Sequence, residues 1–478
     1  MKKVMTTLLA MTLAITMTAC SGGNESAEND TTEKATTENS VNEDVSTTDD
    51  ERDGIQKTID EIKSNLQNGF KQNATIDETV LYNDNNVKIT AMELNYGNYK
   101  AELKLMIENN SDESLSFIAG SLGHSGNSIN GYMINDGYLN CNVAAGKKAM
   151  DTIGFGYDDL SIYGIYEIAD IEIDIEIEDD DYNKIYTGPL QIKTTAYDSY
   201  DYSADTYKEA ISSNAFQALY DYSLNYSSED VFYDSNGIRL ISEMMFKNRD
   251  GEDILLLEVE NNSSDIVNIG VSDIALNGLT IESGSWTSET VNPGKRCIID
   301  VIFSNMLDKN IWELYGIDEI GEIEFALNIH GDSYYDIIDS SDINITIPNA
   351  KASFDNSGNE IYNNNGIRLV SKKAIDDSSS YSNNIHIMLL AENNSDKDIS
   401  ITDEYNSFSV NGFMMNCSFY GQTIPAGKSV IMEIYLWSMY LDDSNISCAD
   451  DIEEFEIKLR IRDDNYKDID TPTIAVTY

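Results

Sequence analysis

The sequence predicts an all-β protein built from three tandem antiparallel β-sandwich domains. Three observations lead to this prediction. Five short landmarks recur three times in the same order, apolar and polar residues alternate around them, and Asn-Gly and Gly-Lys pairs supply the turns. With 478 residues, of which 41% are hydrophobic, the chain is long enough for two to four domains with cores of their own.

The landmarks define three copies of one unit, which we call modules 1, 2 and 3. The first two landmarks are a turn before an apolar strand and a strand that ends in Glu-Asn-Asn. The others are an Asn-Gly pair, a Gly-Lys turn and a late acidic strand. In modules 1, 2 and 3 respectively, the turn before the apolar strand lies at residues 85–89, 236–240 and 365–369, and Glu-Asn-Asn lies at 108–110, 260–262 and 392–394. The Asn-Gly pair lies at 130–131, 277–278 and 411–412, and the Gly-Lys turn lies at 146–147, 294–295 and 427–428. The late acidic strand includes residues 171–173, 323–325 and 455–457.

The alternation of apolar and polar residues indicates that each module is made of β-strands. Leu103, Leu105 and Ile107 occupy every second position before the first Glu-Asn-Asn, and modules 2 and 3 repeat the pattern. A period of two marks a half-buried strand. Asn and Gly favour the positive φ angles that hairpin turns need. Several short strands with frequent turns predict a sandwich of the immunoglobulin type.

The amino terminus predicts the location. Two lysines precede an apolar stretch over residues 4–19, which is too short for a comfortable membrane span and which ends in Met17-Thr18-Ala19 directly before Cys20. This order resembles the lipobox of bacterial lipoproteins. The resemblance implies that residues 1–19 are a signal peptide and that Cys20 carries a diacylglycerol thioether on the extracytoplasmic face of the membrane. An ordinary secretory signal with an incidental cysteine is the alternative.

The remaining segments follow in order. Residues 20–53 are polar and acidic and predict a disordered tether. Residues 54–72 carry an apolar stripe that predicts a short amphipathic helix. The modules occupy residues 76–195, 229–348 and 359–478. A Tyr-rich linker with a helix expected over residues 204–222 fills 196–228, and a short linker fills 349–358.

The modules resemble a known domain. The series Asn130-Gly131-Tyr132-Met133, residues 143–148 and residues 168–177 is similar to an uncharacterised immunoglobulin-like domain common in Gram-positive lipoproteins. The resemblance implies a fold and a surface location. It brings no established activity, so it assigns no catalytic residue.

Cysteine and histidine offer few catalytic candidates. Cys141, Cys297, Cys417 and Cys448 do not recur at equivalent positions, and a Cys417–Cys448 bridge within module 3 stays open. No Cys-x-x-Cys pair is present. His124, His330 and His386 also fall at non-equivalent positions. We therefore expect no catalytic residue, no metal-binding residue and no cofactor, and we expect the protein not to be an enzyme.

Acidic turns are the best binding candidates. Carboxylates stand beside a tyrosine at residues 179–182, 331–334 and 463–466. Clustered oxygens can bind Ca²⁺, but Asp and Asn also favour turns for their own backbone hydrogen bonds. We expect ordinary turns. A calcium-dependent envelope protein or an unrecognised cell-wall-modifying enzyme is the alternative, and a two-lobed solute-binding protein is disfavoured.

The net charge restricts the partners. The chain holds 31 Lys+Arg against 84 Asp+Glu, a formal net charge of −53. This charge argues against nucleic acid and against binding to anionic lipid through a basic patch. We expect contact with the membrane through the lipid on Cys20, and a protein or cell-wall partner is open. The sequence does not predict the ligand or the oligomeric state.

Overall fold

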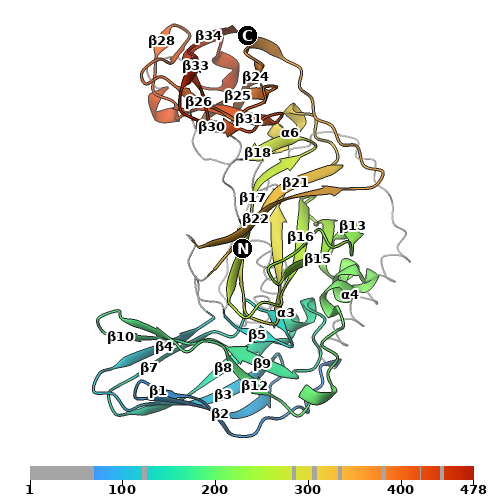
Figure 1. Cartoon of the computed structure of the whole chain (residues 1–478), viewed down its shortest axis with the longest axis vertical. Helices are drawn as coiled ribbons and strands as arrows, with labels where there is room; N and C mark the ends of the chain where they lie inside the picture. The colour runs from blue at the N-terminus through green and yellow to red at the C-terminus, as the bar shows by residue number, and fades with distance from the viewer. Residues whose placement is uncertain are drawn as a thin grey trace, which may run out of the picture. The chain divides into compact units, whose positions relative to one another are not determined.

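The computed structural model confirms the all-β class with mainly antiparallel sheets, although each of the two largest sheets also contains a parallel strand pair (Figure 1). It describes residues 69–120, 126–282, 287–303, 309–331, 336–377, 384–419, 421–441 and 446–478. The predicted signal peptide, Cys20, the tether and residues 54–68 of the predicted helix lie outside this part of the chain.

The chain forms two compact units whose limits differ from those of the modules. In the described part of the chain, unit 1 contains residues 69–229, 241–266 and 290–300, and unit 2 contains residues from 230–240, 267–289 and 301–478. Module 1 therefore lies in unit 1 and module 3 in unit 2, while module 2 contributes strands to both.

Two four-stranded sheets belong wholly to module 1. The order of the first is β1-β2-β3-β8, with β1 Thr79–Asp84, β2 Val87–Tyr96, β3 Lys100–Asn109 and β8 Lys148–Gly156. The order of the second is β11-β10-β4-β7, with β11 Lys184–Tyr186, β10 Glu176–Asp179, β4 Leu115–Ala119 and β7 Leu139–Val143.

A nine-stranded sheet joins module 1 to module 2. Its order is β12-β9-β5-β6-β20-β16-β15-β13, and β14 pairs with β15. Module 1 provides β12 Leu190–Lys193, β9 Asp170–Ile173, β5 Ser128–Ile129 and β6 Tyr132–Met133. Module 2 provides β20 Lys295–Ile302, β16 Asp253–Asn261, β15 Ile238–Lys247 and β14 Tyr233–Ser235, and β13 Ser223–Ser228 comes from the preceding linker.

A ten-stranded sheet joins module 2 to module 3 in the same way. Its order is β22-β21-β17-β18-β31-β25-β24-β23. Module 2 provides β22 Ile337–Thr346, β21 Glu322–His330, β17 Val267–Leu276, β18 Leu279–Glu282 and the short β19 Thr287–Val291. Module 3 provides β31 Ser429–Leu436, β25 Ile385–Asn393, β24 Ile367–Asp376, β23 Asn359–Asn364 and β29 Ser418–Phe419, which pairs with β31.

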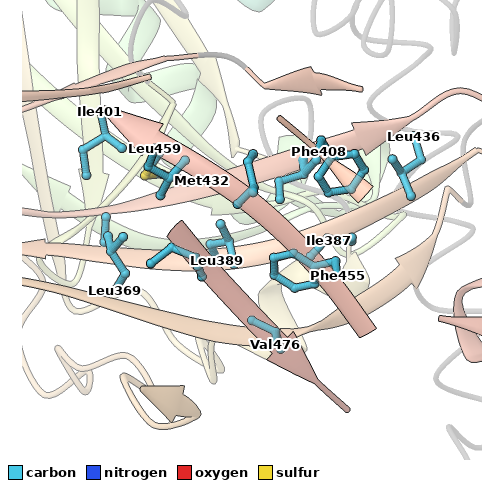
Figure 2. Close-up of a cluster of buried hydrophobic side chains, with 14 of the residues drawn as sticks. Leu369, Ile387, Leu389, Ile401, Phe408, Met432, Leu436, Phe455, Leu459 and Val476 are labelled. Carbon is cyan, nitrogen blue, oxygen red and sulfur yellow. The ribbon is translucent and has the colours of Figure 1, made fainter. Parts of the chain in front are cut away.

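Module 3 completes its sandwich with a seven-stranded sheet. The order is β28-β27-β32-β26-β30, with β33 Asp468–Asp470 and β34 Thr473–Thr477 also paired to β32. The main strands are β28 Phe413–Met414, β27 Ser409–Val410, β32 Glu454–Asp463, β26 Ile399–Asp403 and β30 Gln422–Ile424. Figure 2 shows the core between the two sheets, where Leu389 and Met432 of one sheet face Leu459 and Phe455 of the other.

The helices are short. The linker after module 1 holds η1 Tyr197–Ser199, α4 Thr206–Ser212 and α5 Asn214–Tyr220, so the helix expected over residues 204–222 is present as two helices. Ser213 separates them because it ends α4 and its hydroxyl caps α5. The modules add α3 Tyr157–Ile162, α6 Lys309–Leu314, η3 Ser438–Tyr440 and η4 Ala449–Asp451. None of the helices in the described ranges is long and apolar enough to cross a membrane.

Candidate functional site

The Glu-Asn-Asn landmark places one buried asparagine in each module. Asn393 donates from Nδ2 to the carbonyl oxygens of Lys397 (2.7 Å) and Ile424 (2.8 Å). Its Oδ1 accepts from the amide and the hydroxyl of Ser395. Asn109 and Asn261 make the same four bonds in modules 1 and 2. This landmark is therefore a structural corner that ties the end of a strand to a distant one.

The Asn-Gly landmark has an equally structural role. Asn411 has a positive φ of 48°. Its Nδ2 donates to the Asp451 carbonyl oxygen, and its Oδ1 accepts from the amides of Glu453 and Glu454. Asn130 and Asn277 make the equivalent bonds to the start of the late acidic strand of their own modules. The acidic strand is thereby fixed beside the short strand that follows Asn-Gly.

The Gly-Lys landmark contacts the preceding module. Lys295 of module 2 is buried, and its Nζ lies 3.2 Å from both Asp170 Oδ2 and Glu172 Oε2 of module 1. Asn292 donates to the other Glu172 oxygen, and Gln191 donates to the other Asp170 oxygen. Each carboxylate oxygen in this buried network therefore has a partner, as a buried ion pair requires.

The junction between modules 2 and 3 repeats this arrangement. Lys428 stands where Lys295 does, and its Nζ pairs with Glu324, which is the counterpart of Glu172. The strand pairing also repeats. Tyr132 pairs in parallel with Arg296 at the first junction, and Leu279 pairs in parallel with Ser429 at the second. Each junction thus consists of an acidic strand and a short edge strand from one module, and of a lysine and a strand from the next.

An arginine reinforces the first junction. The Arg296 guanidinium lies 3.4 Å from Glu258 Oε1 and 3.6 Å from Glu260 Oε1. It also donates to the Tyr132 hydroxyl of module 1. Burial, aided by repulsion from Asp205, raises the pKa of Glu258 to about 8. Glu258 is therefore largely protonated at neutral pH, in which state it can remain buried without a full compensating charge.

The tyrosine that directly follows α3 in module 1 or α6 in module 2 also contributes to the junction with the next module. The Tyr163 ring lies 5.8 Å from both Tyr132 and Tyr207, centroid to centroid, and so connects module 1 to α4. Tyr315 is fully buried and donates its hydroxyl to the Leu389 carbonyl oxygen in module 3 (2.8 Å). Ser447 occupies the equivalent position in module 3.

The acidic turns largely satisfy their own hydrogen bonds. Asp179 Oδ1 accepts from the amides of Asp181 and Asn183, and Asp463 Oδ1 accepts from the amides of Asn465 and Lys467. Each turn exposes a tyrosine with positive φ, Tyr182 or Tyr466. Residues 332–335 of the module 2 turn lie outside the described part. In the part that the structure describes, no group of three or more His, Cys, Asp or Glu side chains is placed to hold a metal ion.

Cysteine and histidine side chains stay apart. Cys141 and Cys297 are buried, and neither they nor Cys417 and Cys448 form a disulfide, so the structure does not contain the bridge that the sequence left open. Burial raises the pKa of the Cys417 thiol to about 12, which leaves it protonated and unreactive at neutral pH. His386 Nδ1 lies 2.8 Å from Glu433. His330 is buried in module 2, and His124 lies outside the described residues.

The contact between modules was not predicted from the sequence. The Gly-Lys turn and the acidic strand were both recognised as landmarks, but each was assigned a role within its own module. Their opposite charges and their constant order were the signal that connects them across modules, since Lys295, Lys428 and their carboxylate partners recur together.

Comparison with known proteins identifies no relative. No protein-family model and no curated protein matches the sequence. Among solved structures, the chain is similar to a 1.5-MDa bacterial ice-binding adhesin studied for its retention on the host cell surface, with 9% identity, a TM-score of 0.14 and coverage of 79% of this chain and 90% of that one. A BSP domain of a biofilm-associated protein has 12% identity, a TM-score of 0.14 and coverage of 87% and 70%.

An enzyme is also among the similar structures. A red sea bream transglutaminase matches with 9% identity and a TM-score of 0.14, covering 55% of this chain and 31% of that one. At these identities and TM-scores, none of the three similarities carries an argument about function.

Proposed function

We propose that this chain is a non-catalytic lipoprotein of the bacterial cell surface, anchored through Cys20, whose acidic β-sandwich modules act as a spacer or as binding domains. The observation that carries the spacer role is the sharing of sheets at both junctions. β6 pairs with β20, and β18 pairs with β31, so neighbouring modules are joined by strand pairing as well as by their linkers.

The ion pairs at the junctions support the same role. A bare linker lets two domains reorient, whereas a buried lysine held by two carboxylates favours one arrangement. Lys295 provides this restraint between modules 1 and 2. A stiff connection is useful in a protein that displays a binding surface at a distance from its anchor.

The location rests on the amino-terminal sequence. The order of two lysines, an apolar stretch, Met17-Thr18-Ala19 and Cys20 is the feature that favours acylation. Two or more acyl chains on one cysteine hold a protein stably on a bilayer. The polar residues that follow provide distance between this anchor and the modules.

Labelling with a radioactive fatty acid tests the anchor. The full chain is expressed in a Gram-positive host with tritiated palmitate, and we expect the label on the wild-type protein and its recovery with the membrane. The Cys20→Ser variant should lose the label. Cys417→Ser is the matched control and should keep it, because Cys417 lies within module 3. A wild-type protein without label, or label retained by Cys20→Ser, would contradict the proposal.

Affinity capture tests the choice between spacer and binding domain. The full chain is immobilised and exposed to wall fractions and secreted proteins of the same host. A partner retained at micromolar concentration would support a binding role, and the absence of any retained component would leave the spacer role alone.

A further inference from the structure

The two ends of the module array resemble the two halves of a junction. We call the acidic end of a module its acidic strand together with the edge strand after Asn-Gly. We call the lysine end its Gly-Lys lysine together with the first residues of the strand that follows. At both junctions within the chain, the acidic end of one module contacts the lysine end of the next.

The acidic end of module 3 is open. Phe413 and Met414 of β28 are 49% and 66% exposed, whereas Tyr132 and Leu279, which occupy the position of Phe413 in modules 1 and 2, are 3% and 0% exposed. Figure 1 shows β28 at the end of module 3 away from the β18–β31 pair. Among the described strands, β28 pairs only with β27.

Two acidic side chains at the same end of module 3 are also exposed and without an ion-pair partner in the described part of the chain. Glu454 and Glu456 of β32 are the counterparts of Asp170 and Glu172, which bind Lys295 at the first junction. Both side chains are exposed, and neither forms an ion pair within the described ranges. An exposed strand edge with apolar side chains beside two unpaired carboxylates is an unusual surface for a monomer.

The lysine end of module 1 is the complementary open surface. β8 is an edge strand of its four-stranded sheet. Lys147 is the counterpart of the buried Lys295, yet it is exposed and has no ion-pair partner among the described residues. Met150, three residues further on, is also exposed.

The surroundings of Lys147 match the internal junctions. Lys148 pairs with Glu108, as Arg296 pairs with the equivalent Glu260 in module 2. The start of β8 therefore has the same charged residues as the start of β20. It differs from β20 in that no edge strand of a preceding module lies beside it in the described structure. The missing elements are a short apolar strand and two carboxylates, which are the elements left open on module 3.

We infer that a second copy of this chain binds head to tail, so that Lys147 and β8 of one chain contact Glu454, Glu456 and β28 of the next. The charges are opposite, both surfaces expose apolar side chains, and the same contact already occurs twice within the chain. Because the two surfaces differ, the contact is heterologous, and each added chain leaves one open surface of each kind. Assembly therefore continues past two chains, into a filament or, where the rotation between chains closes, into a ring. This inference goes beyond the proposed surface role and does not depend on it.

Sedimentation of the full chain tests the inference. In a detergent whose micelles are matched in density, we expect the weight-average mass to rise past that of two chains between about 1 µM and about 500 µM, the range of interfaces of modest area. The variants Lys147→Glu and Phe413→Asp each destroy one surface and should keep the monomer mass over this range. Tyr466→Asp, which changes an exposed tyrosine of the acidic turn, is the matched control and should assemble as the wild type does.

Mixing the two variants gives the decisive result. The Lys147→Glu chain keeps its acidic end and the Phe413→Asp chain keeps its lysine end, so one contact remains and the mixture should stop at two chains. This outcome also shows that both variants are folded. A wild-type chain that stays monomeric, variants that assemble as the wild type does, or a mixture that stays monomeric would overturn the inference.

Discussion

In each module, a single buried asparagine links the end of one strand to a distant strand. Asn393 is fully buried and serves two carbonyl groups and one serine, and no other uncharged side chain of its size offers both two donors and an acceptor in that geometry. The sequence showed that this residue recurs. It did not show its role, because the Ile424 carbonyl that it binds lies in another strand and has no side-chain signature of its own.

Replacing this asparagine should destabilise module 3. We expect Asn393→Ala to lower the free energy of unfolding by about 2–4 kcal/mol, since the Ile424 carbonyl loses its buried donor and the Lys397 carbonyl and the Ser395 amide each lose a hydrogen bond. Asn393→Asp should do no better, because an ionised carboxylate cannot donate. Urea unfolding followed by circular dichroism measures the change. Asn394→Ala alters the exposed neighbour and should change stability by less than about 0.5 kcal/mol; equal losses for both alanine variants would contradict the assignment.

At the scale of elements, periodicity predicted the long strands well and the short ones poorly. The stretch before each Glu-Asn-Asn forms β3, β16 and β25 as expected. The two-residue strands β5 and β6 were missed because two residues show no period, although β6 is the strand that joins module 1 to β20. The late acidic strand of module 1 is divided into β9 and β10, which belong to different sheets, whereas β32 of module 3 continues unbroken.

The three Gly-Lys lysines offer a graded test of the junctions. Lys295→Met should cost about 3–5 kcal/mol, because it leaves Asp170 and Glu172 buried without their cation. Lys428→Met should cost about 0–1 kcal/mol, because the pair with Glu324 is partly exposed. The exposed Lys147 is the matched control, and Lys147→Met in dilute monomer should leave stability unchanged within about 0.5 kcal/mol.

Calorimetric melting of the three variants ranks them. A junction that depends on its buried lysine requires Lys295→Met to give the largest loss by a clear margin. If all three variants melt alike, the recurrence of the lysine has another cause, such as the geometry of the turn itself.

At the scale of the whole molecule, the negative charge belongs to the modules. Residues 1–50 hold three lysines and nine acids, so −47 of the formal −53 lies on residues 51–478. Only part of it is neutralised in ion pairs, and charges of one sign on a folded domain repel one another more than they do in an expanded chain. Salt shortens the range of this repulsion to about 10 Å at 0.1 M and to about 3 Å at 1 M.

Added salt should therefore stabilise the protein. We expect the melting temperature to rise between about 10 mM and about 500 mM NaCl, with most of the rise below about 150 mM, where the screening length changes fastest. Ca²⁺ and Mg²⁺ at matched ionic strength separate screening from site binding. Similar shifts for the two ions would mean screening of the acidic surface. A shift with micromolar Ca²⁺ alone would revive the calcium-dependent alternative and would point to oxygens beyond the self-bonded turns at Asp179 and Asp463. A melting temperature that falls as salt is added would show that attractive pairs, and not net repulsion, dominate the electrostatic energy of the modules.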